Sequence, residues 1–227
     1  MKLRNFVLDL LFPRKCLICR KILNMNDTRD VCDDCLPKLP YAGDKGFTDK
    51  YEFLEAVCSP YFYKGELAEA IKRFKFNNCK GYYAFFACEM AEYISLHING
   101  KFDVITWIPI SSKRMRTRGY NQAQLLAEKI AQILDIEALP MLIKHRDNPP
   151  QSGINKIERR KANVSGVYKL AADVGGKRVL IIDDIVTSGA TLSECAMTLL
   201  LGGAECVYGA TIATAHRKKK KRPRQIK

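Results

Sequence analysis

The most restrictive feature of this sequence is the segment 179–192, which reads VLIIDDIVTSGATL. Four apolar residues predict a buried strand, two adjacent carboxylates follow, and a loop of small and hydroxyl-bearing residues then opens a helix. In open parallel α/β sheets, ligands bind beyond the carboxyl ends of the strands. The segment therefore indicates both a fold class and the place of a binding site.

Most of the remaining chain alternates between short apolar strands and amphipathic helices. Strands are expected at 56–63, 102–110, 141–144, 179–183 and 206–213, and helices at 66–76, 82–98, 122–134 and 192–201. Such alternation indicates an α/β fold with a mostly parallel sheet covered by helices on both faces.

The loop after the two acids has the composition of a phosphate cradle. Its backbone N–H groups and hydroxyls can bind one phosphate, helped by the dipole of the following helix. The residues concerned are Thr187, Ser188, Gly189, Ala190 and Thr191. The carboxylates of Asp183 and Asp184 suit sugar hydroxyls or a magnesium ion instead. Together they indicate a ribose 5-phosphate site, with a generic β–α turn as the alternative.

Nine cysteines are present, and four of them form two knuckles. Two residues lie between Cys16 and Cys19 and two between Cys32 and Cys35, and twelve residues separate the pairs. This spacing predicts a closed, structural four-thiolate zinc site, whose metal would supply folding free energy to a short segment. Dithiol redox chemistry and plain buried cysteines are the alternatives. The odd count favours a reducing compartment.

The chain divides into three expected parts. Residues 1–46 hold an N-terminal helix and the zinc ribbon, 47–216 the α/β domain, and 217–227 a basic tail. A turn-rich linker at 36–48 predicts the first boundary. Neither a convincing signal peptide nor a run of about eighteen apolar residues occurs, so the expected location is the cytoplasm, with peripheral contact at the inner membrane as an option.

Positive charge is concentrated in two places. The formal net charge is +14, of which the tail at 217–227 carries eight basic residues and no acid. The segment 101–163 accounts for the remaining excess, with twelve basic and six acidic residues. The ordinary interpretation of such a tail is a solvated end, and the alternative is contact with phosphate groups, either of a nucleic-acid backbone or of anionic lipid.

A family resemblance follows from these motifs taken together. The acids and the T-S-G-A-T loop resemble the signature of type I phosphoribosyltransferases. The stretch WIPISSKRMRTRGYNQAQLLA at 107–127 resembles one family among the proteins with this signature. With the cysteine knuckles, residues 14–216 look like the ComF family. That resemblance implies a zinc ribbon joined to a phosphoribosyltransferase-like domain, associated with DNA uptake in natural competence.

The resemblance also implies roles for basic residues after the second strand. In related phosphoribosyltransferases the corresponding loop holds the diphosphate, which here falls to Ser112 and Lys113, with Arg114 and Arg118 as supports. A solvated basic turn is the alternative.

A second basic stretch, 144–163, is too polar for a core element and too long for an ordinary connection. By the same resemblance it corresponds to a flexible loop that covers the diphosphate during transfer. The residues assigned to that task are Arg146, Gln151, Arg159 and Arg160. A connector without a role is the alternative.

The implied chemistry is displacement of pyrophosphate from C1 of phosphoribosyl pyrophosphate. Magnesium and Lys113 would neutralise the leaving group while Asp183 and Asp184 hold the ribose. Three functions stay open: a transferase with an unidentified acceptor, a non-catalytic sensor of the sugar diphosphate, and a single-stranded DNA handling protein working with competence proteins. Alternation of Lys72, Arg73 and Lys75 with Phe74 and Phe76 suits base stacking and phosphate contacts as well as an ordinary amphipathic helix.

Overall fold

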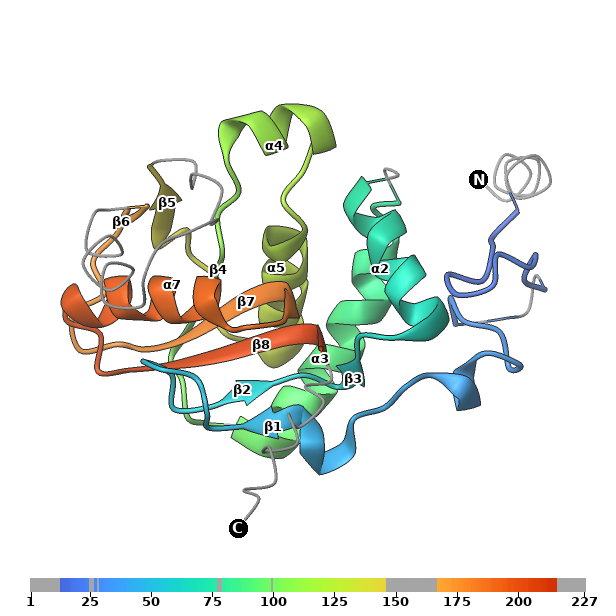
Figure 1. Ribbon diagram of the computed structural model, residues 1–227, viewed down its shortest axis with the longest axis horizontal. Coiled ribbons are helices and arrows are strands. Elements are labelled where there is room, and N and C mark those ends of the chain that lie inside the picture. The colour runs from blue at the N-terminus through green and yellow to red at the C-terminus, as the bar shows by residue number, and fades with distance from the viewer. Residues whose placement is uncertain are drawn as a thin grey trace, which may run out of the picture.

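The computed structural model describes residues 13–24, 27, 29–76, 79–98, 100–145 and 167–215. These residues form a sheet flanked by helices, with a small cysteine-containing lobe next to helix α2 (Figure 1). The expected N-terminal helix and the basic tail at 217–227 lie outside the described residues.

A mostly parallel sheet forms the centre of the molecule. Its strands are β1 Phe47–Thr48, β2 Val57–Cys58, β3 Tyr61–Phe62, β4 Val104–Trp107, β7 Arg178–Val186 and β8 Cys206–Thr214. The strand order is β1-β2-β8-β7-β4, and β3 also pairs with β8. β1 is antiparallel to β2, whereas the other pairs are parallel. This arrangement confirms the predicted α/β class.

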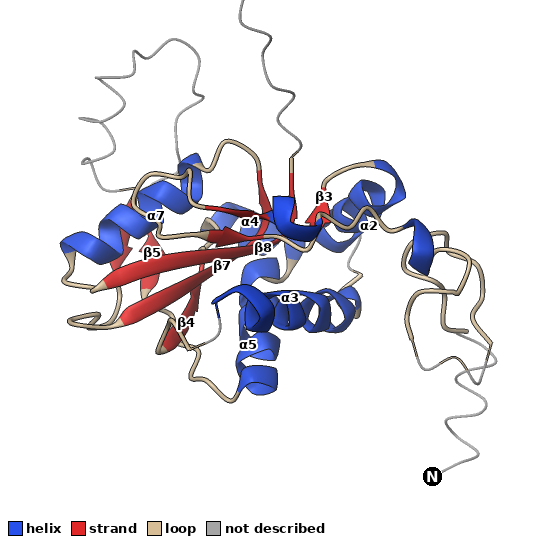
Figure 2. Ribbon diagram, turned by 90° about the horizontal axis from the view of Figure 1, so that it is seen from below, coloured by secondary structure: helices blue, strands red, loops and turns tan. Residues whose placement is uncertain are grey.

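Helices cover both faces of the sheet. The helices are α2 Gly65–Phe76, α3 Tyr82–Ile98, α4 Ser112–Arg118, α5 Gln122–Leu134 and α7 Ala190–Leu201, and two short 3-10 helices span Leu36–Lys38 and Gly43–Gly46. α3 and α5 pack together on one face, and α7 lies on the other (Figure 2).

Alternate residues of β7 face the two sides of the sheet. Leu180 and Ile182 join the cluster that includes α3 and α5, while Val179 and Ile181 join the cluster that includes α7. All four side chains are fully buried. A strand covered on both faces needs a continuous apolar run, which is why this segment has one.

The signature strand and its helix extend further than predicted. β7 continues past Asp183 to Val186, and Asp183 lies opposite Thr211 of β8. The helix begins at Ala190, directly after Gly189, rather than at Leu192. The acids are therefore strand residues, because ladder pairing with β8 continues after them, and the loop between strand and helix is very short.

Other differences from the predicted elements have local causes. The strand expected at 56–63 is interrupted at Ser59-Pro60, because proline has no N–H for the ladder. β5, Leu142–Lys144, lies outside the main sheet and pairs antiparallel with β6, Tyr168–Leu170. The basic segment expected as a loop forms helix α4 instead, capped by Ser111 and ended by Gly119 at φ 74°.

The cysteine lobe shares its core with the rest of the protein. Leu17 and Ile18, between the first two cysteines, are buried in the same cluster as Phe74 of α2 and Phe86 of α3. The lobe thus buries its few apolar residues against the α/β part. The boundary at residue 46 stays a prediction.

No helix among the described residues is long and apolar enough to cross a membrane. All nine cysteines lie in the described part of the chain and form no disulfide there.

Candidate functional site

Two adjacent acids lie on the floor of the principal cavity. Asp184 is buried, with 9% of its surface exposed, and its backbone N–H donates to Oδ1 of Asp183 at 2.8 Å. Desolvation and the neighbouring charge of Asp184 raise the pKa of Asp183 to about 7. Because the two carboxylates are adjacent, a cation that reaches one of them also lies close to the other.

Lys75 supplies such a cation from the end of α2. Its Nζ lies 2.8 Å from Oδ1 of Asp184, and the two side chains are 20% and 12% exposed. The sequence suggested Lys75 only as part of a DNA-contacting face of this helix and did not predict its contact with Asp184, because the pair joins residues far apart in the chain.

The acids open into a cavity of about 860 Å³. The residues that line it come from α2 and the turn before it, the segment after β4 with α4, the start of α5, the paired strands β5 and β6, the end of β7, and the loop before α7. Those with polar or charged side chains include Lys75, Lys113, Arg114, Thr117, Arg118, Asn121, Gln122, Lys144, Asp183, Asp184, Thr187 and Thr191. Most of the charged residues are basic, so the cavity suits an anionic ligand larger than one phosphate.

Helix α4 carries the predicted basic residues into this cavity. Lys113, Arg114 and Arg118 line it, whereas Ser112 does not. Ser111 lines the cavity instead, and its hydroxyl accepts the backbone N–H of Arg114 at 3.3 Å as the helix N-cap. Burial lowers the pKa of Arg118. The structure therefore brings three of these four predicted residues together with the acids.

The loop 187–191 forms a smaller pocket of about 40 Å³ beside the acids. All five predicted residues line it, together with Asp183. Gly189 has φ 77°, and a Cβ there would lie 2.0 Å from Cδ1 of Tyr51. Glycine is thus required by backbone conformation and by packing against Tyr51, a reason that the motif alone did not reveal.

The segment after α4 fastens the cavity wall to α2. Tyr120 donates its hydroxyl to the carbonyl of Phe74, and Gln122 Nε2 donates to the carbonyl of Lys75 at 3.2 Å. Asn121 caps α5 by accepting the N–H of Ala123 at 3.0 Å. Its amide also donates to Ile108 at the end of β4, at 3.0 Å. These residues belong to the stretch 118–122, here called the R-G-Y-N-Q stretch, and they connect several walls of the cavity.

The segment that carries Arg146, Gln151, Arg159 and Arg160 lies outside the described residues. Lys144 before it and Tyr168 after it both line the cavity, and Lys144 Nζ lies 5.7 Å from the centroid of the Tyr168 ring. The two ends of the segment therefore meet at the edge of the cavity. Its predicted role in covering the ligand stays a prediction.

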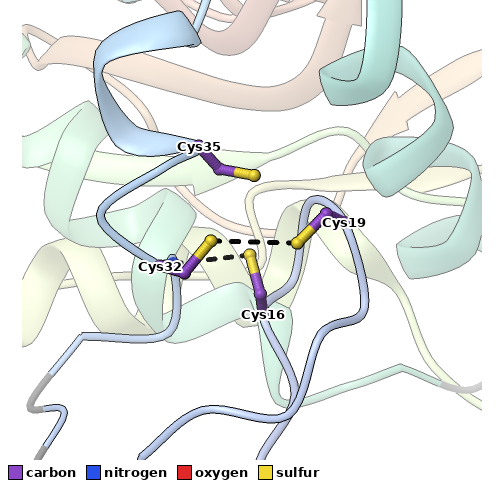
Figure 3. A group of neighbouring side chains, drawn as sticks. All are labelled: Cys16, Cys19, Cys32 and Cys35. Atoms are coloured by element: carbon purple, nitrogen blue, oxygen red, sulfur yellow. Dashed lines mark hydrogen bonds between the residues drawn. The ribbon is translucent and has the colours of Figure 1, made fainter.

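The four knuckle cysteines converge on one point (Figure 3). Their sulfurs all lie within 4.8 Å of one another, and Cys19 Sγ is 3.8 Å from Cys32 Sγ. Tetrahedral zinc at its usual bond length to sulfur gives sulfur separations of about 3.8 Å, so the four residues fit a structural zinc ion. Although burial raises it, backbone hydrogen bonds from Cys32, Cys19 and Ile18 lower the pKa of Cys16 to about 7.

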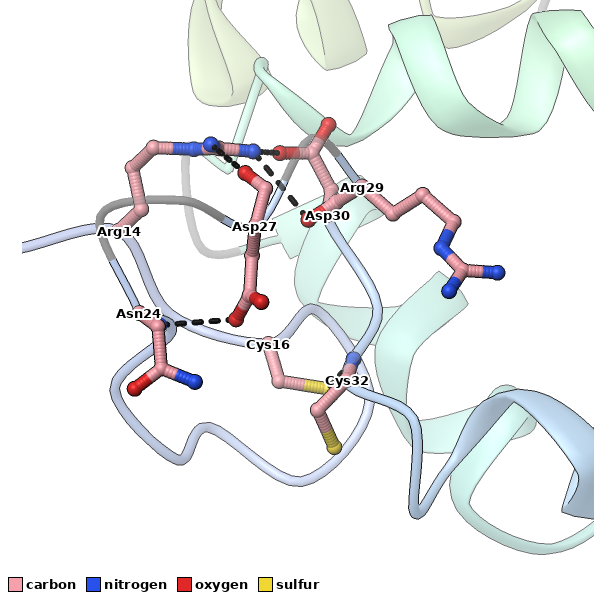
Figure 4. A network of polar contacts seen from close by, with 7 residues as sticks. All are labelled: Arg14, Cys16, Asn24, Asp27, Arg29, Asp30 and Cys32. Carbon is pink, nitrogen blue, oxygen red and sulfur yellow. Dashed lines mark hydrogen bonds and ion pairs between the residues drawn. The ribbon is translucent and has the colours of Figure 1, made fainter.

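Arg14 connects the segment that carries Cys16 with the segment that precedes Cys32 (Figure 4). Its guanidinium donates to the carbonyl of Asp27 at 2.6 Å and pairs with Asp30 at 2.8 Å. It also donates to the carbonyl of Arg29 at 3.3 Å. These bonds bring the segment before Cys32 against the segment that carries Cys16, where the N–H of Cys32 donates to Cys16 Sγ at 3.4 Å.

Two family models match the chain. A phosphoribosyl transferase domain matches residues 121–227, and a double zinc ribbon domain matches residues 7–45. The first match contains the acids and the loop 187–191, and the second contains all four knuckle cysteines.

Individual proteins and structures resemble the chain over part of its length. Competence protein F of Haemophilus influenzae is 33% identical over 107 residues, 45% of this chain and 46% of that protein. Competence protein ComFC of Bacillus subtilis is 34% identical over 146 residues, 64% and 58% respectively. The chain spans about half the length of these curated relatives. A solved adenine phosphoribosyltransferase is 16% identical, with a TM-score of 0.41, covering 63% of this chain and 74% of that one.

Proposed function

Because the chain belongs to the ComF family, with a double zinc ribbon ahead of a phosphoribosyltransferase-type domain, we propose that its cavity binds phosphoribosyl pyrophosphate in the service of DNA uptake during natural competence. One observation carries the proposal. The acid pair, the hydroxyl-rich loop and the basic helix α4 all border the same cavity.

Each part of the ligand has a matching region in this arrangement. The 5-phosphate suits the loop 187–191, where the N-terminus of α7 presents backbone N–H groups. The ribose hydroxyls suit Asp183 and Asp184, whose oxygens accept hydrogen bonds. The diphosphate suits Lys113, Arg114 and Arg118, which supply positive charge to the same cavity.

Magnesium belongs to the same proposal. Adjacent carboxylates in a basic cavity provide the oxygen ligands that the ion prefers, with the ligand's own phosphates completing the coordination. When bound, the ion would offset the negative charge of the diphosphate. The acids would then hold the sugar, and the α4 residues would orient the leaving group.

In a transferase, the bond between ribose C1 and the diphosphate oxygen breaks and a bond from C1 to the acceptor forms. The diphosphate leaves with the electron pair of the broken bond, stabilised by Lys113 and Arg114. A sensor would bind the same ligand without this exchange. Free thiols suit the cytoplasm, where the proposal places the protein.

The DNA role is supported by charge and by the names of the relatives. The tail at 217–227 and the excess of basic residues at 101–163 suit the phosphates of single-stranded DNA. On α2, Phe76 is 64% exposed and suits stacking against a base alongside Arg118, whose guanidinium carbon lies 4.7 Å from the ring centroid, whereas Phe74 is fully buried. Partner proteins of the uptake machinery belong to the same proposal.

One set of assays tests the proposed function. Titration calorimetry with phosphoribosyl pyrophosphate, with and without magnesium, should give saturable binding. Pyrophosphate release, followed with single nucleobases and with single-stranded DNA, distinguishes a transferase from a sensor. Absence of binding under both metal conditions would remove the sugar-diphosphate function.

A further inference from the structure

Helix α2 connects the cysteine ribbon with the acid pair. Three consecutive residues near its end, Arg73, Phe74 and Lys75, each contact a different part of the protein. Arg73 points to the ribbon, Phe74 to the core and Lys75 to the cavity floor. A displacement of this one turn would therefore reach both sites.

At the ribbon, Arg73 binds the backbone between the first two cysteines. Its Nη2 donates to the carbonyl of Leu17 at 2.7 Å and to the carbonyl of Ile18 at 2.8 Å. Its Nε is buried and has no hydrogen-bond partner among the described residues. Four thiolates around one zinc ion carry net negative charge, which favours a guanidinium beside this knuckle. The place of Arg73 thus depends on the folded, metal-bearing turn.

At the cavity, the same turn is fixed by three contacts. Lys75 Nζ lies 2.8 Å from Asp184. The carbonyl of Lys75 accepts from Gln122 at 3.2 Å, and the carbonyl of Phe74 accepts from the hydroxyl of Tyr120. Phe74 is fully buried beside these contacts, so a shift of the turn also changes the packing of the core. The ammonium of Lys75 therefore has a defined place beside the acid pair.

We propose that Lys75 is a positioning residue for the acid pair, and that Arg73 makes its position depend on the folded zinc ribbon. The ligand side of this inference rests on the proposed function, because the acids are taken to hold the sugar of phosphoribosyl pyrophosphate. When the knuckle relaxes, Arg73 loses both carbonyl acceptors and the last turn of α2 loosens. Asp184 then loses its fixed counter-charge, and the sugar diphosphate binds less tightly.

The first test needs no ligand. In the zinc-loaded protein, acetylation mapped by mass spectrometry should modify Lys75 several-fold more slowly than Lys72, whose side chain is 53% exposed and pairs with Glu69 on the surface. Arg73→Gln should bring the rate at Lys75 toward that of Lys72. The control Lys72→Gln, which removes the same charge from the same helix, should leave Lys75 protected. Equal protection of Lys75 in Arg73→Gln and wild type would overturn the inference.

The second test uses phosphoribosyl pyrophosphate. Arg73→Gln should weaken its binding by about five-fold or more, the lower end of usual coupling between sites. Lys75→Met should weaken it similarly, and adding Arg73→Gln to Lys75→Met should change little further, because both act through one contact. Lys75→Arg should recover part of the affinity.

The outcomes separate the two proposals. Strictly additive effects of Arg73→Gln and Lys75→Met, with circular dichroism showing all variants folded, would overturn the coupling. A zinc-loaded wild type that binds no phosphoribosyl pyrophosphate would defeat the proposed function, while the acetylation rates would still decide whether Arg73 positions Lys75.

Discussion

Replacement of Phe74 by alanine should destabilise the protein strongly. The ring is fully buried, and its centroid lies 6.0 Å from those of both Phe86 and Tyr120. Removing a buried phenyl group loses its transfer free energy and leaves a cavity, which together typically cost about 3–5 kcal/mol in the free energy of unfolding. Phe74 is enclosed by rings on two sides, so collapse of the site should be limited and the cost should lie within that range.

Phe76, two residues further along α2, provides the matched control. It is 64% exposed, and its main described partner is Arg118, whose guanidinium carbon lies 4.7 Å from the ring centroid. Phe76→Ala should therefore cost no more than about 1 kcal/mol. Urea unfolding followed by far-ultraviolet circular dichroism measures both variants. Equal losses for Phe74→Ala and Phe76→Ala would refute this assignment of the core face of α2.

Three further predictions concern the metal, the acids and the tail. Purified protein should contain one zinc ion by elemental analysis, and Cys16→Ser should lower both zinc content and unfolding temperature; full stability of a zinc-free wild type would argue against the ribbon. Because the pKa of Asp183 is raised from 3.8 to about 7, the folded state keeps a proton that the unfolded state releases, so the free energy of unfolding should fall as pH rises across that interval. Asp183→Asn should flatten this dependence, and an unchanged slope would contradict it. Deleting 217–227 should make single-stranded DNA binding less sensitive to salt: the slope of log affinity against log salt concentration should decrease in magnitude by up to about 6. The affinity for phosphoribosyl pyrophosphate should not change. An unaltered slope would exclude the tail from DNA contact.

The sequence was most informative where a site is built from consecutive residues. The acids and the loop 187–191 are neighbours in the chain. A strand followed directly by a helix brings them together independently of contacts with the rest of the protein. The same holds for the cysteines, since each knuckle is a local turn. These features could be predicted without tertiary information.

Contacts between distant segments could not be predicted in the same way. Lys75 pairs with Asp184 only because α2 packs beside the R-G-Y-N-Q stretch, and its helical pattern suited a solvated lysine equally well. Tyr51 explains Gly189 through packing that no motif records. The helical state of α4 depends on the cap at Ser111, in a segment whose charge favoured a loop.

Binding of phosphoribosyl pyrophosphate at the acid pair is tested most directly by calorimetric titration of the zinc-loaded protein, in parallel with the double variant Asp183→Asn, Asp184→Asn. The wild type should show saturable, magnesium-dependent binding, and the folded double variant should show none at the same concentrations. Equal affinity of the two proteins would place the ligand elsewhere, and absence of binding by the wild type would contradict a sugar-diphosphate function altogether.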